Sequence, residues 1–188
     1  MFHVKHSLEE GLKELEITPD KEKINGIALY IEELIRWNEK INLISRRLSQ
    51  EEIVNKLILP SLIPHKIIHP GEKVLDFGAG AGIVGIPLKI VLPGITMHLV
   101  ESRTKPTSFL HYIQGILNLD IKVIKKFVRK SGDLPLHYDS VLVRAVEMEN
   151  IPSGIGERVI YYGEYKGKTL KLEFSLRFRD WQVSILSF

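Results

Sequence analysis

The sequence predicts an α/β fold: a Rossmann-like, mostly parallel sheet that follows an N-terminal helical extension. Short apolar runs alternate with helical patterns over residues 72–188, the order that builds a parallel sheet covered by helices. The last two runs, 170–174 and 181–186, have no helical pattern between them. We therefore expect an antiparallel hairpin at the C-terminal edge of this sheet.

Residues 1–70 are predicted to form the helical extension, and residues 71–188 the sheet-containing domain. Helix starts are expected at a capping box that begins at Ser7, at Thr18-Pro19, and at a further capping box that begins at Ser49. Apolar residues at helical spacing follow these starts. Three prolines, at positions 60, 64 and 70, then end the helical pattern.

Within the second part, each expected element is a short apolar segment of the right length for its type. The predicted strands cover about 73–77, 96–101, 121–126, 139–144 and 158–163, and the predicted helices 82–91 and 104–117. The segment from Glu147 to Glu157 is short for a full helix between two strands.

The most informative stretch is the turn between the first predicted strand and the helix after it. It has the pattern Asp76-x-Gly78-x-Gly80-x-Gly82, which fits at every position the loop of methyltransferases that use S-adenosylmethionine. Glycine allows positive φ angles and close approach of the backbone to a ligand. The Gly-x-Gly-x-x-Gly dinucleotide pattern fits only loosely, so an NAD-dependent oxidoreductase stays open as an alternative.

A second acid supports a nucleoside cofactor. Glu101 ends the next predicted strand, 21 positions after Gly80 (101 − 80), close to the roughly 20 residues expected for an acid that binds ribose hydroxyls. A carboxylate can accept hydrogen bonds from both hydroxyls of a cis-diol. We therefore expect Asp76, Gly78, Gly80, Gly82 and Glu101 to bind the cofactor.

Composition excludes several kinds of chemistry. The 188 residues contain no cysteine, which rules out thiolate catalysis and cysteine-bound zinc. The histidines show no metal-ligand spacing, and no apolar stretch reaches the ~18 residues of a membrane span. The net charge of +3 permits nucleic-acid binding without requiring it. The expectation is a cytoplasmic monomer without a metal.

Several motifs together are more specific than the glycine loop alone. They are Trp37-Asn38-Glu39-Lys40-Ile41-Asn42-Leu43, Asp76 to Pro87, Val100-Glu101-Ser102 and Val143-Arg144-Ala145. With these motifs the chain resembles the bacterial small-subunit ribosomal RNA guanine-N7 methyltransferases, also called glucose-inhibited division protein B. The resemblance implies the class I S-adenosylmethionine-dependent methyltransferase sheet, S-adenosylmethionine as cofactor, and 16S ribosomal RNA in the small ribosomal subunit as partner.

The resemblance also adds site residues. It implies that Gly78, Ile83, Val128, Arg129 and Arg144 contact the cofactor. Because Arg144 comes after the fourth strand, where ligands of α/β sheets lie, we also expect it near the reaction centre as the catalytic residue. Members of the family carry an acid near the adenine, where this chain has Phe127-Val128-Arg129. For that reason a non-catalytic RNA-binding protein on a methyltransferase scaffold is a further alternative.

The expected chemistry needs no general base, because guanine N7 attacks the methyl group with a free lone pair. Alignment and exclusion of water are then the main requirements. The candidate RNA-binding residues are the basic side chains of Arg46, Arg47, Arg103, Lys105, Lys125, Lys126 and Lys166. A solvated basic face is the competing interpretation of the lysine run near residue 125.

Overall fold

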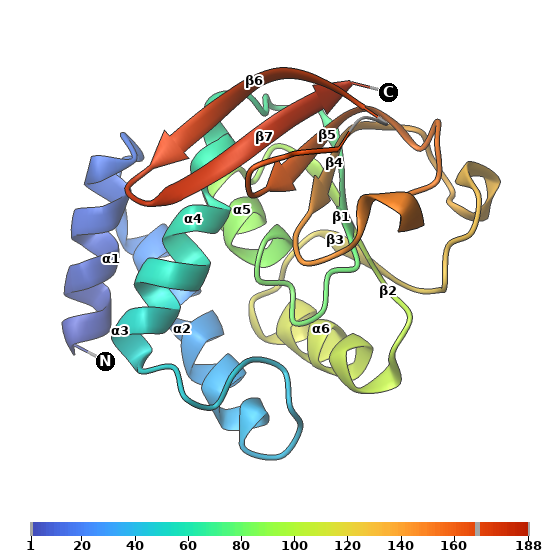
Figure 1. The fold of residues 1–188 in the computed structure, drawn as a ribbon. Helices are drawn as coiled ribbons and strands as arrows, with labels where there is room; N and C mark the ends of the chain where they lie inside the picture. Colours follow the sequence, from blue (N-terminus) through green and yellow to red (C-terminus); the bar gives the residue numbers. More distant parts are fainter. Residues whose placement is uncertain (1, 168–169, 188) are drawn as a thin grey trace.

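A computed structural model describes residues 2–167 and 170–187. In these residues one seven-stranded sheet has the order β3-β2-β1-β4-β5-β7-β6 (Figure 1). The neighbours among the first five strands run parallel, and β7 runs antiparallel to both β5 and β6. The predicted fold class is confirmed, hairpin included. The strands are β1 (Lys73–Phe77), β2 (Thr96–Glu101), β3 (Ile121–Lys125), β4 (Tyr138–Val143), β5 (Gly156–Tyr162), β6 (Lys171–Phe178) and β7 (Trp181–Ser187).

Helical segments precede the sheet and connect its strands. The first group is α1 (Phe2–Glu14), α2 (Lys21–Asn38), α3 (Gln50–Glu52), the π-helix η1 (Ile53–Ile58), α4 (Leu59–Ser61) and the 3₁₀-helix η2 (Ile63–Lys66). Within the sheet region lie α5 (Gly85–Val91), α6 (Thr104–Ile116) and the 3₁₀-turns η3 (Ser131–Asp133) and η4 (Met148–Asn150). Between β4 and β5 the described residues form only the 3₁₀-turn η4, in agreement with the sequence, where this segment is short for a full helix.

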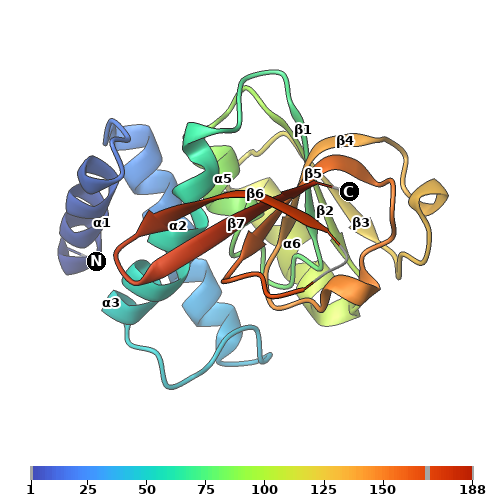
Figure 2. The ribbon, with the colours of Figure 1, turned by 45° about the horizontal axis from the view of Figure 1, so that its top comes forward.

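The two faces of the sheet are covered differently. On one face, Leu8 of α1, Ile27 of α2, Ile86 of α5 and Phe109 of α6 form a buried core with strand residues such as Val74. On the other face the core is smaller and is closed by the connections that contain η3 and η4. Figures 1 and 2 show the helices gathered beside and below the strands, with mainly loops at the opposite end.

The helical extension and the last two strands are in direct contact. Val4 of α1 and Val183 of β7 belong to the same buried core. At the turn between β6 and β7, the Arg179 guanidinium binds the Glu14 carboxylate at 2.6 Å and donates a 2.8 Å hydrogen bond to Asn55 Oδ1. The extension therefore packs against the sheet region through both apolar and polar contacts.

Of the three predicted helix starts, two are displaced in the structure and one is confirmed. The capping box at Ser7 is wrong, because α1 already includes Phe2 and its buried stripe begins at Val4, one turn earlier. The start at Thr18-Pro19 is also displaced: the Asp20 carboxylate caps α2 by accepting from Lys23 N at 2.8 Å. The capping box at Ser49 is confirmed, with both of its reciprocal hydrogen bonds present.

Candidate active site

The glycine loop lies at the carboxyl end of β1, where ligands bind in parallel sheets. Gly78, Gly80 and Gly82 have φ angles of +73°, +56° and +75°, which residues with a Cβ rarely adopt. A Cβ on Gly78 would lie 2.6 Å from Val146 Cγ2, and one on Gly82 would lie 2.6 Å from Ile86 Cγ1. These left-handed glycines delay α5 until Gly85, three residues later than predicted.

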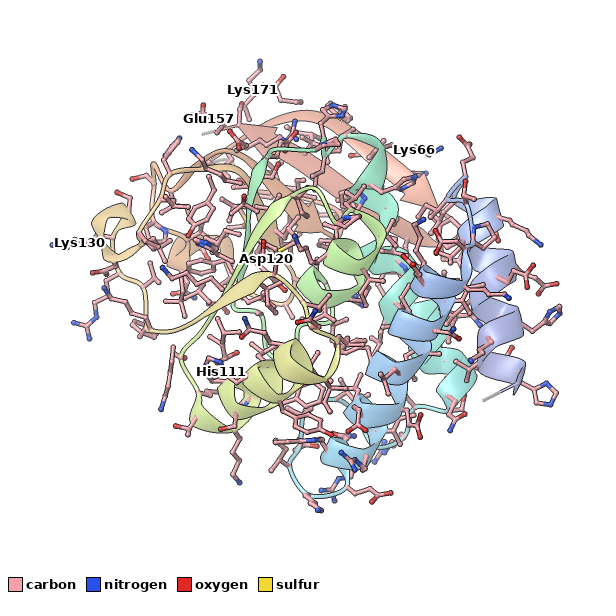
Figure 3. The ribbon with its side chains drawn as sticks, turned by 180° about the vertical axis from the view of Figure 1, so that it is seen from behind. Lys66, His111, Asp120, Lys130, Glu157 and Lys171 are labelled. Carbon is pink, nitrogen blue, oxygen red and sulfur yellow. The ribbon has the colours of Figure 1, made fainter. Side chains whose placement is uncertain are left out.

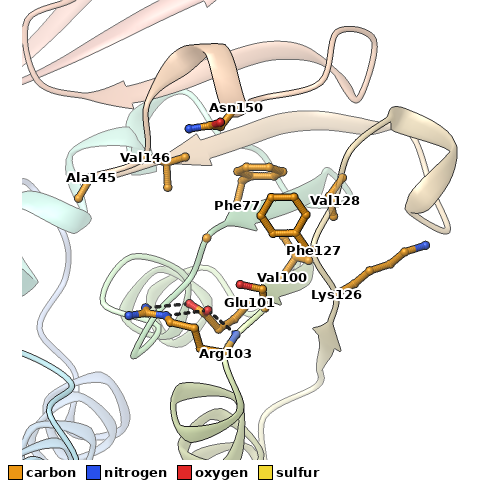
Figure 4. A pocket seen from close by; sticks show the side chains of 12 residues that line it. Phe77, Val100, Glu101, Arg103, Lys126, Phe127, Val128, Ala145, Val146 and Asn150 are labelled. Atoms are coloured by element: carbon orange, nitrogen blue, oxygen red, sulfur yellow. Dashed lines mark hydrogen bonds and ion pairs between the residues drawn. The ribbon is translucent and has the colours of Figure 1, made fainter.

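Beside this loop is a cavity of about 400 Å³ (Figure 4). Its lining residues are Phe77, Gly78, Val100, Glu101, Ser102, Arg103, Lys126, Phe127, Val128, Ala145, Val146 and Asn150. The apolar lining includes Val128, which was predicted to border an adenine, and Phe127, which is 67% exposed. The lining residues that the sequence prediction did not name as site residues are Phe77, Val100, Ser102, Phe127, Ala145, Val146 and Asn150. Several of them lie next to predicted site residues in the motifs, whereas Val146 and Asn150 gave no signal.

Glu101 lies in this cavity at the end of β2 and is only 4% exposed. Its Oε2 accepts from Gly80 N at 2.9 Å, and its Oε1 from Arg103 N at 2.8 Å. The Arg103 guanidinium adds two more hydrogen bonds, Nε to Oε1 at 3.0 Å and Nη2 to Oε2 at 3.1 Å. Burial alone would raise the pKa of Glu101, but these hydrogen bonds hold it below its ordinary value. Glu101 is therefore an ionised acceptor at neutral pH.

A smaller cavity of about 160 Å³ lies across the loop and shares Gly78 and Ala145 with the larger one. Its lining is Leu57, Asp76, Gly78, Ala79, Ile83, Val84, Arg144 and Ala145. Ala145 has a φ angle of +57°, a strained conformation that is concentrated at functional sites. The two cavities are therefore neighbours on the glycine loop, separated at Gly78 and Ala145.

Asp76 lies in the smaller cavity and is 3% exposed. Its Oδ2 accepts a hydrogen bond from Gly85 N at 2.9 Å, which ties the end of β1 to the start of α5. Burial raises the pKa of Asp76 to about 7, although this hydrogen bond and the nearby Arg144 charge act in the opposite direction. Asp76 therefore changes its charge near neutral pH.

Arg144 lines the smaller cavity and also donates hydrogen bonds to the helical extension. Its Nη1 and Nη2 donate to the carbonyl oxygens of Leu57 and Lys56 at 3.0 and 2.9 Å. Pro60 has no N–H to donate to the Lys56 carbonyl four residues earlier, so an outside donor takes that place. The guanidinium also lies 5.2 Å from the ring centroid of Trp181. Burial lowers the pKa of Arg144, which stays charged.

The basic residues predicted to bind RNA fall into two groups. Arg103 and Lys126 line the larger cavity, and Lys126 also pairs with Asp133 at 3.2 Å. Arg129, predicted as a cofactor contact, is exposed and lines neither cavity; its guanidinium carbon lies 5.7 Å from the ring centroid of Phe127. In the same segment Lys130 extends away from the fold (Figure 3). Of these cations, Arg103 and Lys126 border the cavity, and Arg129 and Lys130 do not line it.

The remaining predicted RNA-binding residues line neither cavity. Arg46 donates to the carbonyl oxygens of Asn38 and Glu39, both at 3.2 Å, in the loop after α2. Lys166 pairs with Glu164 at 3.1 Å beyond β5. The other three are exposed on the surface: Arg47, Lys105 and Lys125.

Within the residues that the structure describes there is neither a metal-binding cluster nor a membrane-crossing helix. No group of three or more histidine, aspartate or glutamate side chains is placed to hold a metal ion. Within the same residues, none of the helices combines the length and the apolar character that crossing a membrane would require.

Known structures share this fold. Mycoplasma capricolum TrmK in complex with S-adenosyl-homocysteine superposes with a TM-score of 0.53 at 12% identity, over 78% of this chain and 69% of that one. A ribosomal protein L11 methylase from Lactobacillus delbrueckii gives 0.51 at 15% identity, over 70% and 78% of the two chains. At these identities the likeness concerns the fold alone.

Sequence relatives are much closer. A ribosomal RNA small subunit methyltransferase G from Aquifex aeolicus is 34% identical over 178 residues, covering 90% of this chain and 87% of that protein. One from Syntrophus aciditrophicus is 36% identical over 143 residues, and the match spans only 59% of its length. The model of the family described as rRNA small subunit methyltransferase G matches residues 23–186. The glycine loop and Glu101 lie at the carboxyl ends of neighbouring strands, and the family model matches most of the chain. The chain therefore belongs to the rRNA small subunit methyltransferase G family.

Proposed function

We propose that this protein transfers the methyl group of S-adenosylmethionine to N7 of a guanine in 16S ribosomal RNA. The observation that carries the proposal is the pair of neighbouring cavities at the glycine loop, which share Gly78 and Ala145, in a member of this family. One cavity is large enough for a nucleoside and contains an ionised acid. The other is smaller and polar at Asp76 and Arg144.

The residues present fit the cofactor. The loop is a cradle that a Cβ at Gly78 or Gly82 would fill. Glu101 is the acceptor for a ribose diol, and Phe127 and Val128 offer the apolar surface for an adenine. Backbone groups of the loop, with Asp76, Ile83 and Arg144, would hold the amino-acid end. When bound, S-adenosylmethionine supplies a sulfonium methyl group for transfer to a nucleophile.

The chain's own residues then have to align and shield the reacting atoms. Guanine N7 carries a free lone pair, so no side chain has to remove a proton. Leu57 and Ile83 line the smaller cavity and exclude water from it, which strengthens electrostatic interactions inside. Arg144 borders the proposed reaction centre, and the Asp76 carboxylate next to it favours the positive charge of a sulfonium group.

The proposed RNA surface is the rim of the larger cavity. Arg103 and Lys126 line this cavity, Arg129 lies next to the Phe127 ring, and Lys125 is exposed at the end of β3. Guanidinium and ammonium groups there can neutralise phosphates. Arg46, Arg47, Lys105 and Lys166 are proposed as outer contacts. We further propose that the protein acts as a cytoplasmic monomer on the small ribosomal subunit.

The test is methyl transfer to ribosomal RNA from a strain that lacks the protein. Purified protein, radiolabelled S-adenosylmethionine and either naked 16S RNA or assembled small subunits should give one labelled nucleotide that behaves as 7-methylguanine. Glu101→Ala should lose S-adenosylhomocysteine binding and methyl transfer. The control Glu32→Gln changes an exposed acid of α2 and should retain both. A protein that binds RNA but no S-adenosyl compound would contradict the proposal.

A further inference from the structure

The carboxylate that should hold the ribose is fully occupied by protein donors. Both oxygens of Glu101 accept two hydrogen bonds each, four in all, at 2.8 to 3.1 Å. A carboxylate offers about four lone-pair sites. As the structure stands, no acceptor site on Glu101 is free for two ribose hydroxyls.

The four donors are not equally exchangeable. Gly80 N and Arg103 N belong to the backbone of the glycine loop and of the residue that precedes α6, so they are fixed by the fold. The other two hydrogen bonds come from the Arg103 guanidinium, which lies across the carboxylate in Figure 4. The Arg103 side chain is 67% exposed, whereas Glu101 is 4% exposed. Rotation about side-chain bonds therefore frees the carboxylate without disturbing the core.

We propose that Arg103 exchanges partners during the reaction cycle. In the protein without cofactor its guanidinium closes on Glu101. Ribose hydroxyls displace it, and the released guanidinium then binds a phosphate of the RNA substrate at the rim of the cavity. Arg103 is thus a positioning residue that makes cofactor and RNA binding cooperative. The inference rests on the proposed function, because it needs a ribose on Glu101 and an RNA substrate.

The chemistry of the released group fits this role. A guanidinium matches a phosphate with two parallel hydrogen bonds, as it matches a carboxylate. The backbone of Arg103 is anchored at the start of α6, so the charge remains at the cavity rim after release. Lys126 lines the same cavity but interacts with Asp133 and its carbonyl at 3.2 and 2.9 Å. Ribose binding to Glu101 would release Arg103 and leave the Lys126 contacts in place.

The coupling between cofactor binding and RNA binding is reciprocal, so both affinities have to be measured. If bound cofactor raises the affinity for RNA, bound RNA raises the affinity for cofactor by the same factor. Opening a partly exposed ion pair opposes cofactor binding by a modest factor, roughly two- to five-fold. Arg103→Ala should therefore bind S-adenosylhomocysteine roughly two- to five-fold more tightly than the unaltered protein at low salt.

The experiment combines calorimetry with RNA binding. Titrations with S-adenosylhomocysteine use the unaltered protein, Arg103→Ala and Arg103→Lys. The matched control is Arg36→Ala, which removes another exposed arginine (57%) from a glutamate pair on α2, outside both cavities. Fluorescence anisotropy of a 16S-derived RNA hairpin is then recorded with and without S-adenosylhomocysteine. We expect the cofactor product to raise RNA affinity in the unaltered protein and in Arg36→Ala.

In Arg103→Ala this effect of the cofactor product on RNA affinity should vanish. Arg103→Lys keeps a charge for a phosphate but cannot bond both oxygens of Glu101 in the same way, so it should retain part of the effect. Weaker or equal binding of S-adenosylhomocysteine by Arg103→Ala would overturn the inference, as would an undiminished effect on RNA in that variant. Unaltered protein that binds no S-adenosylhomocysteine would instead overturn the proposed function.

Discussion

Replacing Gly82 by alanine tests whether the glycine loop needs space as well as unusual dihedral angles. The φ angle at Gly82 is +75°, and an L-residue in this region costs about 1–2 kcal/mol. The new methyl group would also lie 2.6 Å from Ile86 Cγ1 and 2.8 Å from Leu110 Cδ2. Overpacking of this kind costs about 1–3 kcal/mol. The expected loss in the free energy of unfolding is therefore about 2–5 kcal/mol.

Two other glycines separate these contributions. Gly80 has a φ angle of +56°, but a Cβ there would lie no closer than 3.8 Å to a neighbouring atom, so Gly80→Ala should lose only about 1–2 kcal/mol. Gly115 is helical, and a Cβ there would meet nothing within 4 Å. Gly115→Ala should stabilise the protein by about 0.5–1 kcal/mol, since alanine is the better helix former.

Urea unfolding followed by tryptophan fluorescence measures all three variants. Trp37 packs against Phe109 and Tyr112, with ring centroids 5.5 and 5.0 Å apart, so its emission reports on the packing of α2 against α6. Linear extrapolation gives the free energies of unfolding. A loss in Gly82→Ala no larger than that in Gly80→Ala would refute the argument from close contacts.

Three further changes test the side chains of the site. Arg144→Ala should destabilise the protein by about 1–3 kcal/mol, because two helix carbonyls lose their donors. The melting temperature and the rate of methyl transfer should both fall, and Arg144→Lys should restore only part of each. Phe127→Ala should weaken S-adenosylhomocysteine binding roughly three- to ten-fold by calorimetry and leave the melting temperature unchanged, since the ring is 67% exposed. The pKa of Asp76 is about 7 in the fold and 3.8 unfolded, so its contribution to stability is complete below pH 4 and is lost as pH rises to 7. Relative to Asp76→Asn, the unaltered protein should lose stability over this range by at most about 1.4 kcal/mol per pH unit, and equal pH profiles would contradict the assignment.

The strands were predictable because their signal is local. Residues 73–77 and 96–101 are apolar runs that are buried in the sheet, and the structure has strands with these bounds. Helix starts were less predictable. Ser7 carries a capping pattern, but burial of Val4 against the rest of the core extends α1 beyond it. A tertiary contact decides that boundary, and no short pattern encodes it.

The site residues likewise fall into those that a local motif predicts and those that only the tertiary structure brings to the site. Asp76 and Gly78 belong to one contiguous motif and could be placed from the sequence, and Glu101 lies at a known spacing from it. Leu57 could not be placed, because its carbonyl meets the Arg144 guanidinium across 87 positions of sequence. The closing of Arg103 on Glu101 was also invisible, since the order of residues does not show side-chain direction. Which of these residues bind cofactor or RNA stays a prediction.

The contacts of Arg144 bear on how the protein is made. Arg144 directly follows β4, and its guanidinium contacts Leu57 from an early segment and Trp181 from the beginning of β7. While β7 is still inside the ribosome, a nascent chain lacks the ring on which this guanidinium rests. The packing of Arg144, which lines the smaller cavity, is therefore completed only after synthesis has passed residue 181.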